Sequence, residues 1–264
     1  HQMDIRALRE MIVADMAAGH TPFMIAGTAG TVDCGAVDDL EAVYAVAREF
    51  DLWFHVDAAF GALACLSPTY APLLAGIGKA DSLAFDFHKW AQVPYDAGCV
   101  LVRDRTLHAA AFTQSLDYLK REERGLAGNA PWFCDFGPDL SRGFRALKVW
   151  MTLGHYGAHR MGQMVDDCCA VAGHLRDRIE ATEGLTLLAP VTLNIVCFGV
   201  DALSDAEVSE LVQDLHESGI AAPSTTRIHG RLAIRAAIVN HRTTSRDVDR
   251  MLDGVIALCG PRVG

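Results

Sequence analysis

The sequence predicts an α/β protein with a mainly parallel sheet, followed by a small α+β domain at its C-terminal end. Over residues 22–102, short apolar runs alternate with segments of helical period, at spacings that suit the crossover connections of a parallel sheet. Residues 184–264 instead alternate strand and helix patterns over shorter distances. We therefore expect a large domain over residues 1–146 and a small one over residues 147–264.

The first half of the chain has recognisable starts and stops. Asp4 is placed to cap a helix with apolar positions from Ile5 to Met16, and Gly19 is a typical stop. A second helix is expected from the acidic pair at 38–39 to Phe50. Four apolar runs predict strands, and they cover residues 22–26, 52–56, 82–85 and 98–102. Residues 27–31 predict a glycine-bearing loop between the first of these strands and the second helix.

A long connection then interrupts the alternation. Residues 113–139 carry a charged run at 120–124 together with several glycines and a proline, which is typical of a mobile functional loop. Residues 140–181 return to a helical period, with a break expected around Gly154 and Gly157. The remaining elements are expected at residues 185–188, 195–200, 205–217, 232–239 and 246–258.

Composition and charge narrow the classes of function. The chain has 264 residues, 51% of them hydrophobic, and a formal net charge of −10, so a nucleic-acid binder is disfavoured. No apolar run is long enough to span a bilayer, and the start does not read as a signal segment, so neither membrane insertion nor secretion is expected. The eight cysteines form no C-x-x-C spacing, which argues against a zinc site and favours free thiols in the cytoplasm.

Two short segments carry the candidate chemistry. Residues 55–59 (HVDAA) end one predicted strand, and residues 86–90 (DFHKW) follow the next. Ligands of open α/β sheets bind at the carboxyl ends of strands, so both segments are expected to face one crevice. Pyridoxal 5'-phosphate needs a lysine to form its Schiff base and an acid against its pyridine nitrogen. Asp57 and Lys89 supply that pair.

Each residue of this set also has an ordinary structural role. Taken alone, Asp57 could be a loop cap or an ion-pair partner, Lys89 a surface lysine with a packed stem, and His55 a core histidine. In the cofactor hypothesis, Ala59 leaves room for the flat ring and His88 is placed to donate to the phosphate. The combination of these residues, rather than any one of them, favours the cofactor.

The combination resembles the group II pyridoxal-phosphate-dependent amino-acid decarboxylases. The matching segments extend along essentially the whole chain. They are residues 27–31 (GTAGT), 55–61 (HVDAAFG), 81–82 (DS), 88–90 (HKW), 117–120 (DYLK), 141–150 (SRGFRALKVW) and 235–240 (RAAIVN). The resemblance implies part of a fold type I large domain, of the aspartate aminotransferase kind, with a small C-terminal domain.

The resemblance also implies roles for individual residues. Lys89 would form the Schiff base, Asp57 would pair with the pyridinium nitrogen, and Ala59 would lie under the ring. His88 and Thr31 would lie near the cofactor.

Two further roles lie outside the two motifs. Tyr118, in the expected catalytic loop, corresponds to a tyrosine thought to protonate the carbanion after carbon dioxide leaves, and relatives with phenylalanine there tend to be aldehyde synthases. Arg235 corresponds to an arginine near the substrate carboxylate, although a surface or ion-paired arginine is an equal alternative.

Two positions depart from the family pattern. Val32 stands where a second threonine is common, and Asp86 stands where asparagine is common. An acid beside a phosphate is unfavourable unless a positive group offsets it, so the alternative is that Asp86 faces a backbone N–H or a partner chain.

Family members are close to twice this length, and the part that would precede His1 supplies the phosphate-cradling loop, the ring-stacking histidine and much of the dimer contact. The chain is therefore expected to resemble the C-terminal portion of a homodimeric enzyme. The function implied is decarboxylation of an L-amino acid, with a slight preference for an aromatic substrate because of Phe87 and Trp90. The alternatives are an aldehyde synthase, a carbon–carbon lyase, and a non-catalytic remnant. Neither a metal site nor a nucleic-acid role is expected.

Overall fold

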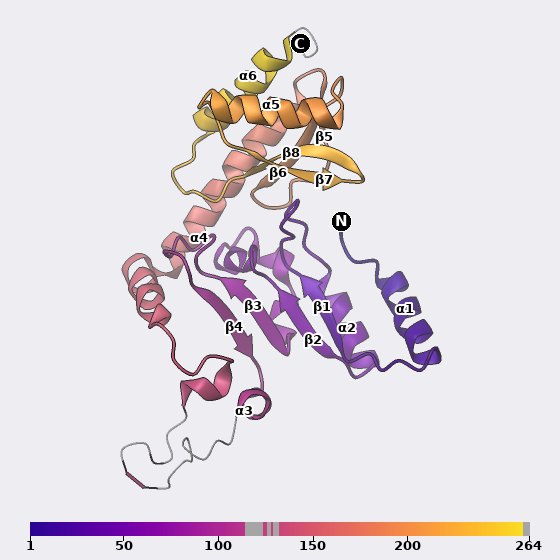
Figure 1. The fold of residues 1–264 in the computed structure, drawn as a ribbon, viewed down its shortest axis with the longest axis vertical. Helices are drawn as coiled ribbons and strands as arrows, with labels where there is room; N and C mark the ends of the chain where they lie inside the picture. Colours follow the sequence, from indigo (N-terminus) through magenta and orange to yellow (C-terminus); the bar gives the residue numbers. More distant parts are fainter. Residues whose placement is uncertain (114–123, 126–127, 129–131, 261–264) are drawn as a thin grey trace.

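The chain folds around two sheets that are joined by one long helix (Figure 1). The computed structural model describes residues 1–113, 124–125, 128 and 132–260. Most of the predicted catalytic loop at 113–139, including Tyr118, lies outside these residues. The α/β prediction is confirmed, with a mostly parallel sheet in the first half and an antiparallel sheet in the second.

The first sheet has the strand order β1-β2-β3-β4. The strands are β1 (Met24–Thr28), β2 (Trp53–Asp57), β3 (Ser82–Asp86) and β4 (Gly98–Val102). The first three run parallel, and β4 pairs antiparallel with β3. The two parallel pairings align the carboxyl ends of β1, β2 and β3 at one edge of the sheet.

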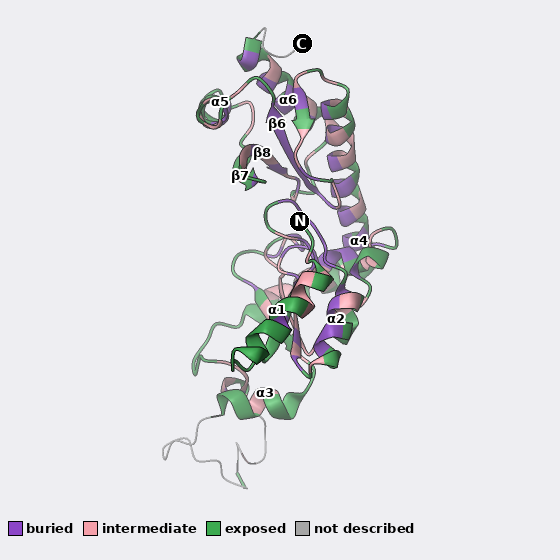
Figure 2. Cartoon of the chain, turned by 90° about the vertical axis from the view of Figure 1, so that its right-hand side faces the viewer, coloured by how far each residue is buried: buried purple, intermediate pink, exposed green. Residues whose placement is uncertain are grey.

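Two helices lie beside strands β1 and β2 of this sheet (Figure 1). They are α1 (Ile5–Ala17) and α2 (Leu40–Glu49). The Asp4 carboxylate caps α1 by accepting from two backbone N–H groups, as predicted, and Asp39 caps α2 by accepting from Ala42. Figure 2 shows α1 largely exposed, whereas α2 presents a buried face. That face consists of Leu40, Val43, Val46 and Ala47, and it packs against the sheet.

Short helical segments fill the remaining connections of the first half. They are α3 (Arg105–Phe112) and the 3-10 turns η1 (Ala62–Leu66), η2 (Ala71–Leu74), η3 (Ile77–Lys79) and η5 (Phe133–Phe136).

The second sheet has the order β5-β6-β8-β7 and is antiparallel throughout. Its strands are β5 (Leu185–Leu187), β6 (Ile195–Val200), β7 (Ser224–Ile228) and β8 (Arg231–Ala237), and its helices are α5 (Asp205–Glu217) and α6 (Ser245–Cys259). All six residues of β6 are buried, because the strand lies in the middle of the sheet under the helices. This unit is the predicted α+β domain.

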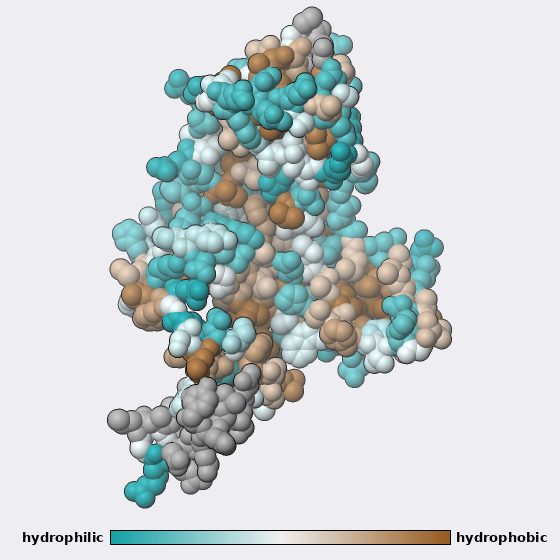
Figure 3. Space-filling view, viewed as in Figure 1, coloured by the Kyte–Doolittle hydropathy of each residue, from teal (hydrophilic) through white to brown (hydrophobic). Residues whose placement is uncertain are grey.

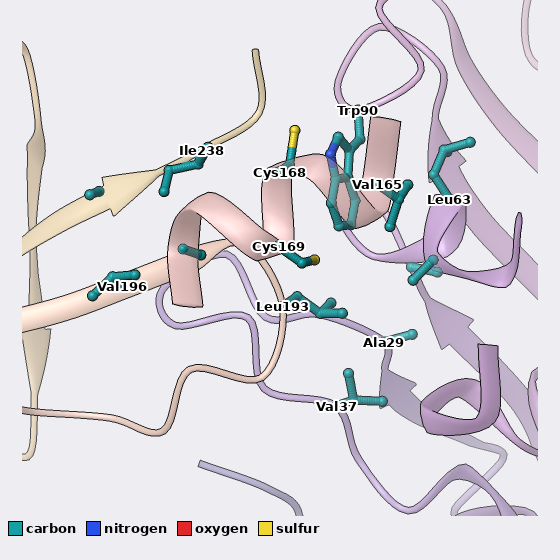
Figure 4. Packing of buried hydrophobic residues seen from close by; sticks show 14 of the residues in the cluster. Ala29, Val37, Leu63, Trp90, Val165, Cys168, Cys169, Leu193, Val196 and Ile238 are labelled. Carbon is teal, nitrogen blue, oxygen red and sulfur yellow. The ribbon is translucent and has the colours of Figure 1, made fainter. Parts of the chain in front are cut away.

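Helix α4 (Arg145–Glu180) connects the two sheets and bends at Gly157, whose φ of 72° is outside the helical region. The predicted break is therefore confirmed at Gly157. Beyond it, the helix packs against both parts of the chain, and Figure 4 shows Val165, Cys168 and Cys169 between Leu63 on one side and Val196 on the other. The predicted boundary between residues 146 and 147 falls inside the first turn of α4.

Part of the first sheet and the start of α4 expose apolar side chains. Val100 and Leu101 of β4 are each about half exposed, and Phe144 and Trp150 are more than 70% exposed. Figure 3 shows apolar residues gathered over the β3–β4 region. Within the described part of the chain, no helix is long and apolar enough to cross a membrane.

Candidate active site

The candidate site lies where β1, β2 and β3 end. Thr28 of β1 lies opposite Asp57 of β2, and Asp57 lies opposite Ala84 of β3. The ends of the three strands are therefore neighbours. Backbone hydrogen bonds also join the first residues after these strands to the neighbouring strand. The N–H of Ala29 donates to the Asp57 carbonyl at 2.8 Å, and the N–H of Ala58 donates to the Ala84 carbonyl at 2.9 Å. This is the edge at which parallel sheets bind ligands.

Asp57 presents its carboxylate outward from this edge. The residue is exposed, while the residues on either side of it, Val56 and Ala58, are fully buried and hold the strand end in place. One carboxylate oxygen, Oδ1, accepts from the backbone N–H of Ala59 at 3.0 Å. That bond orients the side chain and leaves Oδ2 available to a ligand.

Lys89 lies in the turn that follows β3. Its backbone N–H donates to the Asp86 carbonyl at 3.4 Å, which closes the turn. Its Nζ lies 2.7 Å from Oδ2 of Asp86, and the side chain is 40% exposed. The lysine is therefore accessible and is held by one direct ionic partner.

His88 has a defined orientation in the same turn. Its Nδ1 accepts the backbone N–H of Ala97 at 2.9 Å, so in the neutral ring the proton sits on Nε2. The Tyr95 ring lies against the imidazole, with 4.2 Å between centroids. His88 can thus act as an N–H donor through Nε2.

The carboxylate of Asp86 does not take the backbone N–H partner that was predicted for it. We expected its carboxylate to face a backbone N–H or a partner chain, but it pairs with Lys89 and lies 3.9 Å from Nε2 of His88. The reason is the tight turn after β3, which brings positions 86 and 89 together. Sequence reasoning missed this contact, and the i,i+3 spacing of an acid and a lysine was the signal for it.

Trp90 anchors the turn in the core. The residue is 2% exposed, and its ring stacks on Phe60 with 5.7 Å between centroids. The indole lies beside Cys168 of α4 (Figure 4). Phe87 packs edge-on against Phe85 with 4.8 Å between centroids. Trp90 therefore fixes the backbone next to Lys89 rather than lining a pocket.

Thr31 lies in the loop after β1. Its Oγ1 accepts from the backbone N–H of Ala36 at 3.1 Å. The loop approaches the β2 side closely, because Gly61 N–H donates to the Ala29 carbonyl, and a Cβ on Gly61 would lie 2.3 Å from that oxygen. Only glycine fits there, so the loop that carries Thr31 is held next to the Asp57 strand end.

Residues 1–201 match the family described as the pyridoxal-dependent decarboxylase conserved domain. That span includes both strand-end motifs and Tyr118. The chain belongs to the pyridoxal-dependent decarboxylase family.

Relatives of this decarboxylase-family chain agree with that assignment. It is 32% identical to an aromatic-L-amino-acid decarboxylase of Bacillus atrophaeus, over 97% of this chain and 55% of the relative. It is 30% identical to a 4-hydroxyphenylacetaldehyde synthase of Rhodiola rosea, over 92% of this chain and 50% of the relative. Crystalline Oryza sativa TDC with PLP and tryptamine superposes with a TM-score of 0.88 at 28% identity, covering 96% of this chain and 54% of that one. The chain thus spans about half the length of these relatives.

The strand-end residues fit pyridoxal phosphate, the cofactor of the decarboxylase family. An accessible lysine amine and an outward carboxylate are the groups that this cofactor requires, and the edge also offers the small Ala59 and the imidazole N–H of His88. Within the described ranges, no cluster of His, Cys, Asp and Glu could hold a metal ion.

Arg235 of the decarboxylase chain lies on β8 and reaches across to the loop after β1. Its guanidinium donates to the Val32 carbonyl at 2.6 and 2.9 Å, to the Asp33 carbonyl at 3.0 Å and to Ser224 Oγ at 3.2 Å. The structure therefore brings Arg235 to the Thr31 loop. These bonds use three of the five guanidinium N–H groups, so two remain for a substrate carboxylate.

None of the eight cysteines, all of which lie in the described ranges, forms a disulfide. Five are buried, and burial raises the pKa of Cys169 and of Cys197 to about 12. Such thiols are unreactive at neutral pH and act as small apolar residues.

Proposed function

We propose that the chain is the C-terminal portion of an enzyme that converts an L-amino acid, with an aromatic side chain, into its amine and carbon dioxide. The observation that carries the proposal is the placement of the Asp57 carboxylate and the Lys89 amine at the ends of the neighbouring strands β2 and β3. The aromatic preference draws on the relatives, which include an aromatic-L-amino-acid decarboxylase.

Bound pyridoxal 5'-phosphate would supply an electron-accepting ring joined to the substrate nitrogen. In this proposal Lys89 holds the cofactor through its amine, and Asp57 keeps a proton on the ring nitrogen through its free Oδ2. Ala59 lets the ring lie flat against the strand end. His88 would donate its Nε2–H to the phosphate, and Thr31 would lie near the cofactor.

Two further residues complete the proposed set. Tyr118, outside the described residues, would return a proton to the α-carbon of the substrate. Arg235 would bind the substrate carboxylate or, through its bonds to the Val32 and Asp33 carbonyls, hold the loop that carries Thr31. Replacing the arginine distinguishes these two roles, because only the first would raise the KM for the amino acid without a loss of stability.

We further propose that the chain works within a longer polypeptide that forms a homodimer in the cytoplasm. The chain spans about half the length of its relatives, which supports this arrangement. The exposed apolar residues on β4 and at the start of α4 support it too, because surfaces of that kind are normally covered. Free cysteines are usual in a reducing compartment.

The test is carbon dioxide release by the protein expressed from its complete gene, with added cofactor. The substrates are L-tyrosine, L-tryptophan, L-DOPA, L-glutamate and L-2,4-diaminobutyrate, and Lys89→Ala is the control. We expect release from the aromatic substrates and none from the control. Release from L-glutamate or L-2,4-diaminobutyrate alone would reject the aromatic assignment, and no release at all would reject decarboxylation of these substrates.

An aldehyde synthase is the second candidate, because a 4-hydroxyphenylacetaldehyde synthase is among the relatives at 30% identity. Tyr118 disfavours it, since the synthases of the family tend to carry phenylalanine there. The products separate the two reactions, because a decarboxylase releases amine and a synthase releases aldehyde with ammonia.

A further inference from the structure

Asp86 is a direct ionic partner of the lysine on which the proposed function depends. Its Oδ2 lies 2.7 Å from Nζ of Lys89, which is the distance of a charge-assisted hydrogen bond. The two side chains are 21% and 40% exposed, so the pair is partly shielded from water. A neutral amide at position 86, the common residue in the family pattern, would lack this charge.

The turn after β3 places the Asp86 carboxylate beside the Lys89 amine. The residue ends β3 and pairs with Gly98 of β4, and a Cβ on Gly98 would lie 3.1 Å from Oδ1 of Asp86. The turn bond from Lys89 N–H to the Asp86 carbonyl brings the two side chains to the same side. Nε2 of His88, the other basic group at this turn, lies 3.9 Å from the carboxylate.

We propose that Asp86 is a positioning residue that restrains Lys89 before the cofactor is bound, an inference that rests on the proposed function. A lysine amine is an ammonium ion at neutral pH and cannot attack a carbonyl in that form. Here Nζ must also leave the Asp86 carboxylate before it reacts. The nitrogen loses its proton to water and bonds to the aldehyde carbon of the cofactor, and the carbonyl oxygen leaves as water. Separating the ion pair adds to the barrier of that condensation.

We expect the Lys89 amine to condense faster with an aldehyde when the charge of Asp86 is removed. The variant is Asp86→Asn, which keeps the size of the side chain. The probe is pyridoxal, which lacks the phosphate, so repulsion between Asp86 and a phosphate cannot contribute. Partly exposed ion pairs contribute modestly, so the expected acceleration is roughly two- to fivefold.

The rate of condensation is followed by absorbance at fixed neutral pH, and the product is trapped with borohydride and located by peptide mass mapping. The protein is the cofactor-free form expressed from its complete gene. Asp86→Glu, which keeps the charge, should react at nearly the wild-type rate. Asp51→Asn is the matched control, because Asp51 precedes β2 at the opposite end of the strand from Asp57 and tolerates asparagine at its φ of 53°. Unfolding midpoints check that the variants remain folded.

Each outcome decides one claim. A wild-type or slower rate in Asp86→Asn, with Lys89 still the trapped residue, would overturn the role of Asp86 and leave the proposed function intact. An acceleration with pyridoxal phosphate but not with pyridoxal would also overturn it, because Asp86 would then act on the phosphate. Failure to trap Lys89 in any of these proteins would contradict the proposed function itself.

Discussion

The guanidinium of Arg235 donates to the carbonyl oxygen of Val32 across 2.6 Å, and this bond joins the second sheet to the loop that follows β1. The two residues are 203 positions apart in the sequence. Asp33 strengthens the same contact, because its carbonyl accepts from both Arg235 and the Cys197 thiol. The position of the Thr31 loop therefore depends on β8 as well as on the first sheet.

Replacing Arg235 with methionine should loosen this loop. The variant loses several hydrogen bonds from a charged donor, and the freed carbonyls are partly hydrated, so we expect the free energy of unfolding to fall by about 1–2 kcal/mol. Urea unfolding measures the loss. Arg227→Met is the matched control, because Arg227 of β7 is 59% exposed in its ion pair with Asp205 and should contribute less. Unchanged stability together with a raised KM for the amino acid would instead assign Arg235 to the substrate carboxylate.

Replacing a glycine of α4 with alanine should change the free energy of unfolding differently on the two sides of the bend at Gly157. A Cβ on Gly162 would lie 2.2 Å from the carbonyl oxygen of Leu66, so Gly162→Ala forces the helix away from η1. We expect a loss of about 2–4 kcal/mol, in the range of overpacked cores. A Cβ on Gly154 meets nothing within 4 Å, and Gly154→Ala should stabilise the helix by about 0.5–1 kcal/mol. Equal effects of the two substitutions in urea unfolding would contradict this packing.

Asp249 of α6 should make stability depend on acid pH. The hydrogen bond from His174, and then the nearby charges of His174 and Arg178, hold the pKa of Asp249 below its ordinary value of 3.8. The lowered pKa stabilises the folded state above pH 3.8, and that contribution disappears as the pH falls through the folded-state value.

The measurement that tests this role is thermal unfolding of the wild type and of Asp249→Asn at a series of pH values from about 5 downward. The wild type should be more stable than Asp249→Asn near pH 5, and the difference in stability between the two proteins should shrink as the pH falls. A difference that grows toward low pH would contradict the assignment.

Much of the fold could be predicted because its strongest signals are local. The boundaries of β6 and α5 agree with the predictions residue for residue, since β6 is a continuous apolar run and α5 begins at a capping serine. Strand β7 was missed because it lies at the edge of the sheet, next to β8, and its sequence Ser-Thr-Thr-Arg-Ile has no apolar alternation. Strand β1 was placed two residues early, because Gly27 and Thr28 read as a loop.

The candidate site also contains residues that the sequence could identify and contacts that it could not. Asp57 and Lys89 were found because each follows a strand within a short motif, and the topology then brings the strand ends together. The partners of Asp86 and Arg235 were not found. The first depends on the detailed conformation of one turn, and the second on a contact between sheets that are distant in the sequence.

The central claim is that Lys89 is the residue that binds the cofactor. The most direct measurement is borohydride reduction of the protein, expressed from its complete gene and loaded with pyridoxal 5'-phosphate, followed by peptide mass mapping. We expect a reduced cofactor adduct on Lys89, and no adduct at this position in Lys89→Ala. An adduct confined to another lysine, such as the ion-paired Lys79, or no adduct in the wild type, would contradict it.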